Sequence, residues 1–144
     1  DGTRTVSADL VFDAAMRRAG VVRVQNIDQL FFATKALSCG FQPRTDSLAI
    51  VSNGSGPADL AADRAKDLGT ELVGLGSPTI AALERLGGRE RRRHNPLDLG
   101  GDAGPLLYRD AILALADDPA VSNLLVILSP HALVEPVEVA LAHP

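Results

Sequence analysis

Apolar and polar positions along the first forty residues follow the period of helices. Residues 7–19 place apolar side chains at spacings of three and four and stop at Gly20, which predicts an amphipathic helix. Residues 21–24 (VVRV) alternate like a short strand. Asn26 then stands where it can cap a second helical pattern over residues 27–40. The beginning of the chain therefore predicts two helices with a short strand between them.

From residue 47 onward, apolar strand patterns alternate with helical ones. Residues 47–53 (SLAIVSN) predict a buried strand, and the helix after it is expected to take Pro57 as its first residue and to close at Gly69. Further on, Ser77 is expected to cap a helix that starts at Pro78. The remaining patterns predict a strand over 71–76, a helix over 105–116, an apolar strand over 123–129 covered on both faces, and the start of a helix within 134–144.

This alternation predicts an α/β fold in three layers, a flavodoxin-like or Rossmann-like parallel sheet flanked by helices and incomplete at its C-terminal end. Residues 46–144 are expected to form this α/β domain, and residues 1–45 a helical connecting segment. Ligands of such sheets bind beyond the carboxyl ends of the strands. The loops that follow the strands are therefore the first places to search for a site.

Composition and charge exclude several classes of function. Of the 144 residues 46% are hydrophobic and 22% charged, which is typical of a folded domain, and the net charge of −4 argues against a nucleic-acid surface. No apolar run reaches the ~18 residues that span a bilayer. Cys39 is the only cysteine, and the three histidines lack acidic neighbours at ligand spacing, so neither a disulfide framework nor a metal site is predicted. The chain has no initiating Met or signal peptide, which predicts a piece of a longer cytoplasmic protein.

The stretch Asn53-Gly54-Ser55-Gly56 joins the first buried strand to its helix and carries almost no side chain. The amides at a helix N-terminus are free, the helix dipole adds about half a positive charge there, and glycine lets an anion approach the backbone. The stretch therefore predicts an anion or phosphate cradle, with tight packing of a strand-to-helix turn as the alternative. It matches neither a Walker A loop nor a dinucleotide fingerprint, because Pro57 and Ala58 replace the Lys and hydroxyl and a third glycine is missing.

A second glycine loop lies in residues 95–104 (NPLDLGGDAG), where Gly100 and Gly101 precede the helix that begins near Pro105. Two such loops that feed helices can direct two sets of amides at one site. The pair is more informative than either loop alone.

Three segments, GVVRVQNIDQLF, LAIVSNGSGPADLAADRA and NPLDLGGDA, resemble in their order and spacing the NDP-forming acyl-CoA synthetases, the superfamily of succinyl-CoA synthetase. The part from residue 47 onward is similar to the CoA-ligase domain of that superfamily. Residues 7–40 resemble the stretch that follows the phosphohistidine loop in single-chain members. The resemblance covers nearly the whole chain.

The resemblance implies roles for particular residues. Residues 53–56 match the start of a helix whose N-terminus stabilises a phosphohistidine or binds an acyl phosphate. Gly100 and Gly101 match the loop near the acyl carboxylate, and Asp98 is expected to fix that loop rather than to act as a base. Ser129 and His131, after the last strand, are candidates for lining the site. No catalytic residue is expected within this chain, because no histidine precedes residue 7, where the family's phosphohistidine would lie.

Two functional classes stay open for the parent protein. It is an NDP-forming acyl-CoA synthetase, or it resembles bacterial protein lysine acetyltransferases that fuse the same domains to a GNAT domain, in which case this domain is a catalytically silent acyl-CoA sensor. A generic α/β interaction domain is the third reading. The resemblance implies coenzyme A and ADP or ATP with magnesium as cofactors of the parent, none held tightly by this chain. It also implies CoA-binding, phosphohistidine and ATP-grasp domains as partners, and leaves a homo-oligomer open.

Overall fold

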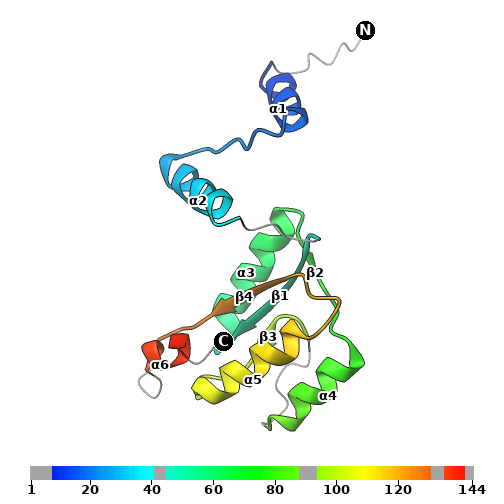
Figure 1. Cartoon of the computed structure of the whole chain (residues 1–144), viewed down its shortest axis with the longest axis vertical. Coiled ribbons are helices and arrows are strands. Elements are labelled where there is room, and N and C mark those ends of the chain that lie inside the picture. The colour runs from blue at the N-terminus through cyan, green and yellow to red at the C-terminus, as the bar shows by residue number, and fades with distance from the viewer. Residues whose placement is uncertain (1–7, 41–44, 88–93, 131–134, 142–144) are drawn as a thin grey trace. The chain divides into compact units, whose positions relative to one another are not determined.

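The computed structural model describes residues 8–40, 45–87, 94–130 and 135–141 of the chain. Its backbone forms two compact units, Asp1–Gln42 and Pro43–Pro144. Figure 1 shows helices alone in the first unit and a sheet with helices in the second. Each unit is described by itself below.

The first unit contains the two predicted helices, α1 (Ala8–Arg18) and α2 (Ile27–Ser38). Asn26 caps α2 as expected, since its Oδ1 accepts a hydrogen bond from the backbone N–H of Gln29 at 2.8 Å. The strand predicted at residues 21–24 is wrong, because the part of this unit that the structure describes offers no other strand to pair with. Neither helix buries any of its residues within the unit.

The second unit alternates strands and helices from residue 47 to residue 141 (Figure 1). In chain order these are β1 (Ser47–Ser52), α3 (Ser55–Asp67), β2 (Glu71–Leu72), α4 (Ser77–Arg85), β3 (Leu97–Asp98), α5 (Pro105–Ala116), β4 (Asn123–Ile127) and α6 (Pro136–Leu141). The predicted strands and helices are all present, and β3 is an additional strand of two residues within a segment that was expected to be a loop. The helix α6 confirms the helical pattern near the C-terminal end.

All pairs in the sheet are parallel and all involve β1. The strand β4 pairs with β1 from Leu48 to Ser52. The strand β2 pairs with the first two residues of β1, and β3 pairs with the last two residues of β1. The carbonyls of Leu48 and Ser52 accept from Val73 N–H at 3.1 Å and Leu99 N–H at 2.8 Å. Because residues two apart in a strand direct their backbone groups to the same side, β2 and β3 share one edge of β1, and β4 takes the other.

The side chain of Asn95 fills the space between β2 and β3 along that shared edge. Its Oδ1 accepts from Ile50 N–H at 2.9 Å, and its Nδ2 donates to the carbonyls of Leu48 at 2.6 Å and Val73 at 3.0 Å. A side-chain amide thus takes the place of a peptide unit. The N–H of Ile50, which lies on β1 between the groups that bond β2 and β3, gains its partner in this way.

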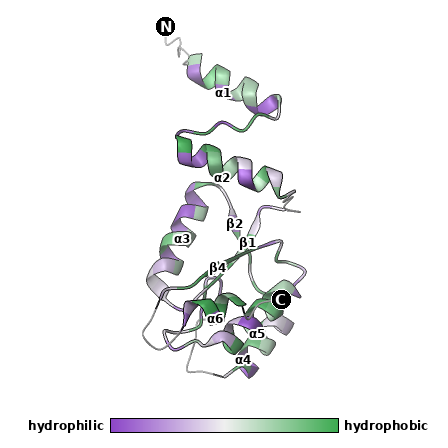
Figure 2. Cartoon of the chain, turned by 60° about the vertical axis from the view of Figure 1, so that its left-hand side comes forward, coloured by the Kyte–Doolittle hydropathy of each residue, from purple (hydrophilic) through white to green (hydrophobic). Residues whose placement is uncertain are grey.

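Helices cover both faces of the sheet, which confirms the predicted three-layer α/β class. Buried Ala58 and Ala65 lie on α3, whereas Ala49 and Val51 of β1 pack in one cluster with side chains of α5. The members of that cluster are Ala49, Val51, Leu97, Leu99, Ala103, Tyr108, Ala111, Leu115 and Val139. Figure 2 shows hydrophobic residues along the central strands and mainly hydrophilic ones on α3.

Two local expectations are wrong for physical reasons. The N-cap of α4 is Gly76 rather than Ser77, because the carboxylate of Asp118 accepts from Gly76 N–H at 2.8 Å and from the Thr79 hydroxyl at 2.7 Å. Asp118, two residues beyond the end of α5, thereby holds the backbone of Gly76 and the side chain of Thr79 at the start of α4. The strand β4 is also not covered on both faces, since Leu125 and Val126 are 39% and 41% exposed.

Candidate functional site

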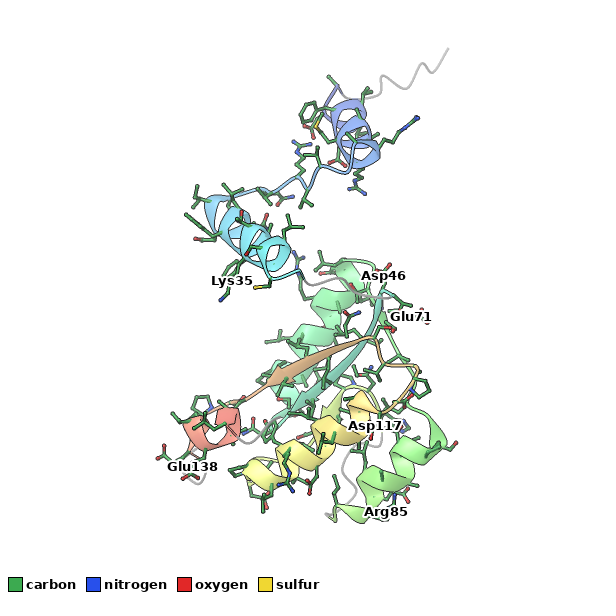
Figure 3. The ribbon with its side chains drawn as sticks, viewed as in Figure 1. Lys35, Asp46, Glu71, Arg85, Asp117 and Glu138 are labelled. Carbon is green, nitrogen blue, oxygen red and sulfur yellow. The ribbon has the colours of Figure 1, made fainter. Side chains whose placement is uncertain are left out.

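The carboxyl ends of three strands meet at one edge of the sheet. Ser52, the last residue of β1, lies opposite both Asp98 of β3 and Ile127 of β4. The chain leaves β1 toward β2 on one side and returns through β4 on the other, which makes this edge the point where strand order reverses. Ligands of open α/β sheets bind at such a point. Asp46 and Glu71, labelled in Figure 3, mark the opposite, amino ends of β1 and β2.

Asn53 joins the loops that follow β1 and β4. Its side chain is 4% exposed. Its Oδ1 accepts from Ser129 N–H at 2.8 Å and its Nδ2 donates to the Ser129 carbonyl at 2.9 Å. The amide therefore acts as one more rung of the β1–β4 pairing beyond the strands, and it holds the two loops together.

The turn into α3 begins two residues earlier than expected. Gly54 is the N-cap, with extended backbone (φ −151°, ψ 135°) and no side-chain cap, so Pro57 is the third helical residue rather than the first. The amide of Ala58 donates to the Gly54 carbonyl at 3.4 Å and opens the helical ladder. The N–H groups of Ser55 and Gly56 come before that ladder, and Pro57 has none. The free N–H donors at the start of α3 are therefore those of Ser55 and Gly56. A helix that began at Pro57, as expected, would have placed them after Pro57.

The fold itself does not require glycine at either position of this turn. A Cβ on Gly54 would stand at ordinary contact distance, 3.6 Å from Pro57 Cδ and 3.7 Å from Ser129 Oγ, and a Cβ on Gly56 would meet nothing within 4 Å. Neither residue has a positive φ. The two glycines therefore leave the backbone at the N-terminus of α3 uncovered, which is what an incoming anion needs.

The second glycine loop is fixed by Asp98. Its Oδ1 accepts from Gly100 N–H at 2.9 Å, the role expected for this carboxylate. Gly100 has a φ of +83°, a conformation that favours glycine, and its carbonyl accepts from Ala103 N–H at 3.0 Å. Gly101 follows in the same turn and is exposed. The loop ends at Gly104, the N-cap of α5, so a second helix begins at the same edge of the sheet.

The third loop begins after β4. Ser129 is held through both backbone groups by Asn53, and its Oγ is directed to the side of Gly54. His131, the other candidate for lining the site, lies outside the described residues. Asn53, Gly54 and Ser129 are thus brought together, with Asp98 and Gly100 across the end of β1.

Tyr108, a buried residue of α5, also reaches this edge. Its side chain is fully buried, and its hydroxyl donates to the Ile127 carbonyl at 2.8 Å. Burial raises the pKa of Tyr108 to about 12, the backbone amide of Asn53 at the phenol oxygen lowers that pKa, and the charge of Asp98 raises it. The hydroxyl therefore stays protonated at neutral pH. Sequence reasoning missed this polar role, whose one signal was the single tyrosine of the chain.

The donors at this edge suit an anion rather than a metal. Among the described residues, no group of three or more His, Cys, Asp or Glu side chains is placed to hold a metal ion.

Within the residues that the structure describes, no helix combines the length and the apolar character that crossing a bilayer requires.

Comparisons with known proteins point to one group of enzymes. The chain is 32% identical over 122 residues to acetate–CoA ligase (ADP-forming) I of Archaeoglobus fulgidus, a match over 84% of this chain and 17% of that protein. It is 31% identical over 136 residues to the alpha subunit of acetate–CoA ligase (ADP-forming) I of Pyrococcus furiosus, over 92% of this chain and 29% of the subunit. No protein-family model matches the chain.

A solved structure has the same fold. It is the dinucleotide-forming acetyl-coenzyme A synthetase 1 of Ca. Korarchaeum cryptofilum in complex with phosphate and ADP, which superposes with a TM-score of 0.86 at 25% identity. The match covers 95% of this chain and 30% of the synthetase. The chain thus spans under a third of the length of these relatives.

Proposed function

Since this chain is homologous to one segment of the ADP-forming acyl-CoA synthetases, we propose that it is the ligase segment of such a synthetase and binds a phosphoryl group at the N-terminus of α3. The reaction joins a carboxylate to CoA while ATP gives ADP and phosphate. The single observation that carries the proposal is the open turn Gly54-Ser55-Gly56. Its glycines are not needed by the fold, and it lies where the strand order reverses.

The chemistry assigned to the turn is stabilisation of negative charge. The N–H groups of Ser55 and Gly56 and the dipole of α3 favour a phosphoryl group, carried on an acyl phosphate or on a histidine from elsewhere in the enzyme. Asn53 holds the turn in place through Ser129. The Ser129 hydroxyl, beside Gly54, is assigned to the rim of the same cradle.

The second loop is assigned to the carboxylate end of the substrate. Gly100 and Gly101 open the way to the N-terminus of α5, and the Asp98 carboxylate, which accepts from the Gly100 N–H, is assigned to holding the loop. We assign CoA, ADP or ATP and magnesium to the complete enzyme. The names of the relatives include CoA and ADP, and one neighbour was solved with phosphate and ADP. The CoA-binding, phosphohistidine and ATP-grasp domains are the proposed partners.

The experiment compares two glycines in the complete enzyme. Gly56→Leu places a side chain over the proposed cradle, and Gly74→Leu, at another open position with nothing within 4 Å of its Cβ, is the matched control. We expect acyl-CoA formation from carboxylate, CoA and ATP to fall at least tenfold, or ~1.4 kcal/mol in the barrier, in Gly56→Leu only. Equal activity of the two variants would contradict the proposal. A wild-type protein that binds acyl-CoA without turnover would instead support the regulatory sensor.

A further inference from the structure

Tyr108 is the residue that connects the separate parts of the candidate site. It lies in the first turn of α5, where its backbone N–H donates to the carbonyl of Gly104 at 3.2 Å. Its hydroxyl donates to the carbonyl of Ile127, the last residue of β4, at 2.8 Å. The side chain thereby ties the second glycine loop to the end of β4.

The strand end that Tyr108 holds is the one that leads to Ser129. Ile127, whose carbonyl accepts from the Tyr108 hydroxyl, stands two residues before Ser129, and Ser129 pairs through both backbone groups with the side chain of Asn53. The buried hydroxyl therefore fixes the strand end to which Asn53 is attached. Water is not expected to replace it, because Tyr108 has no exposed surface.

The turn at Gly54 is held from two sides. The Gly54 N–H donates to Ser52 Oγ at 3.1 Å, and the side chain of Asn53, the residue before it, is fixed by Ser129. Gly54 has no side chain of its own with which to cap α3. The position of the amides that follow Gly54 therefore depends on Ser52 and on the pair formed by Asn53 and Ser129.

We propose that Tyr108 is a positioning residue whose hydroxyl fixes the end of β4, and through Ser129 the side chain of Asn53, and so aims the amides of Ser55 and Gly56. This inference rests on the proposed function, in which those amides bind a phosphoryl group. Hydrogen bonds to an anion weaken steeply as their angle departs from the line of the N–H bond. A small shift of the turn is therefore enough to weaken phosphate binding without unfolding the domain.

The test uses Tyr108→Phe in the complete enzyme. The ring keeps its place in the core, while the Ile127 carbonyl loses the donor that fixes the end of β4. The reaction is followed from acyl-CoA, ADP and phosphate toward ATP. We expect the KM for phosphate to rise roughly fivefold to tenfold, the size of one lost hydrogen bond, with the KM for ADP unchanged.

Thr79→Val is the matched control, because it also removes a buried hydroxyl. That hydroxyl donates to Asp118, with an O–O distance of 2.7 Å, and lies away from the site. An unchanged phosphate KM in Tyr108→Phe overturns the inference, and so does an equal rise in Thr79→Val. Gly56→Leu in the same assay tests the site itself. If Gly56→Leu raises the phosphate KM and Tyr108→Phe does not, only the positioning role falls; if neither raises it, the proposed function falls too.

Discussion

The side-chain amide of Asn53 pairs with the backbone of Ser129 as one peptide unit pairs with another. Its Oδ1 accepts the Ser129 N–H at 2.8 Å, and its Nδ2 donates to the Ser129 carbonyl at 2.9 Å. This pair continues the β1–β4 ladder one step beyond the last paired residues, Ser52 and Ile127. It joins the two loops at the point where the phosphoryl group is proposed to bind.

Replacing Asn53 by Ala is expected to destabilise the domain. The change leaves two backbone groups of Ser129 without partners, so the free energy of unfolding should fall by about 2–3 kcal/mol. Asn123→Ala is the control. Its Nδ2 also donates to backbone carbonyls, those of Thr45 at 2.8 Å and Ser47 at 2.9 Å, but its buried Oδ1 has no partner among the described residues.

Urea denaturation measures both variants. The Asn123 variant should lose at most about 1 kcal/mol, because removal of its unsatisfied oxygen offsets part of the loss. An Asn53 variant as stable as wild type would show that the pair with Ser129 does not hold the loops together.

Asp118 should make the stability of the second unit depend on pH. Burial of this carboxylate raises its pKa, but the hydrogen bonds from Thr79, Gly76 and Ala120 outweigh burial, so the pKa lies below its usual value. A lowered pKa in the folded state stabilises the protein above the unfolded pKa of about 3.9, and that contribution is lost as the pH falls through the folded value.

Asp118→Asn is therefore expected to cost about 1–3 kcal/mol at pH 7, with the difference from wild type shrinking below about pH 4. Thermal or urea unfolding between pH 7 and pH 3 measures this difference. The control is Asp117→Asn, at the exposed end of α5 labelled in Figure 3, which should change stability by less than about 0.5 kcal/mol. A pH-independent difference for Asp118→Asn would show that its charged form does not hold the start of α4.

The sequence predicted those parts of the fold whose signals are local. The apolar run of β1 and the small residues after it predicted a buried strand and a tight turn into α3, and both are present. Asn26 was recognised as a cap because it contacts Gln29, only three residues away. Short-range patterns of this kind appear in the sequence without knowledge of the fold.

Features that depend on distant residues were missed. The two residues of β3 are a strand only because β1 lies beside them. The side chain of Asn95, between β2 and β3, forms hydrogen bonds with backbone groups that are 22 to 47 residues away in sequence. The start of α4 is held by Asp118, 42 residues beyond Gly76. Tyr108 followed the helical spacing of a core residue, and nothing in that spacing indicates where its hydroxyl points.

The most direct test of the phosphoryl site is calorimetric titration of phosphate into the complete enzyme, wild type and Gly54→Ser. Serine is a good N-cap, its Cβ would meet only ordinary contacts, and its hydroxyl can accept the Gly56 N–H that the phosphate is proposed to use. We expect the domain to keep its stability within a few tenths of a kcal/mol and phosphate to bind at least tenfold more weakly, a loss of ~1.4 kcal/mol. An equal phosphate affinity in the two proteins would show that the turn at α3 is not the binding site.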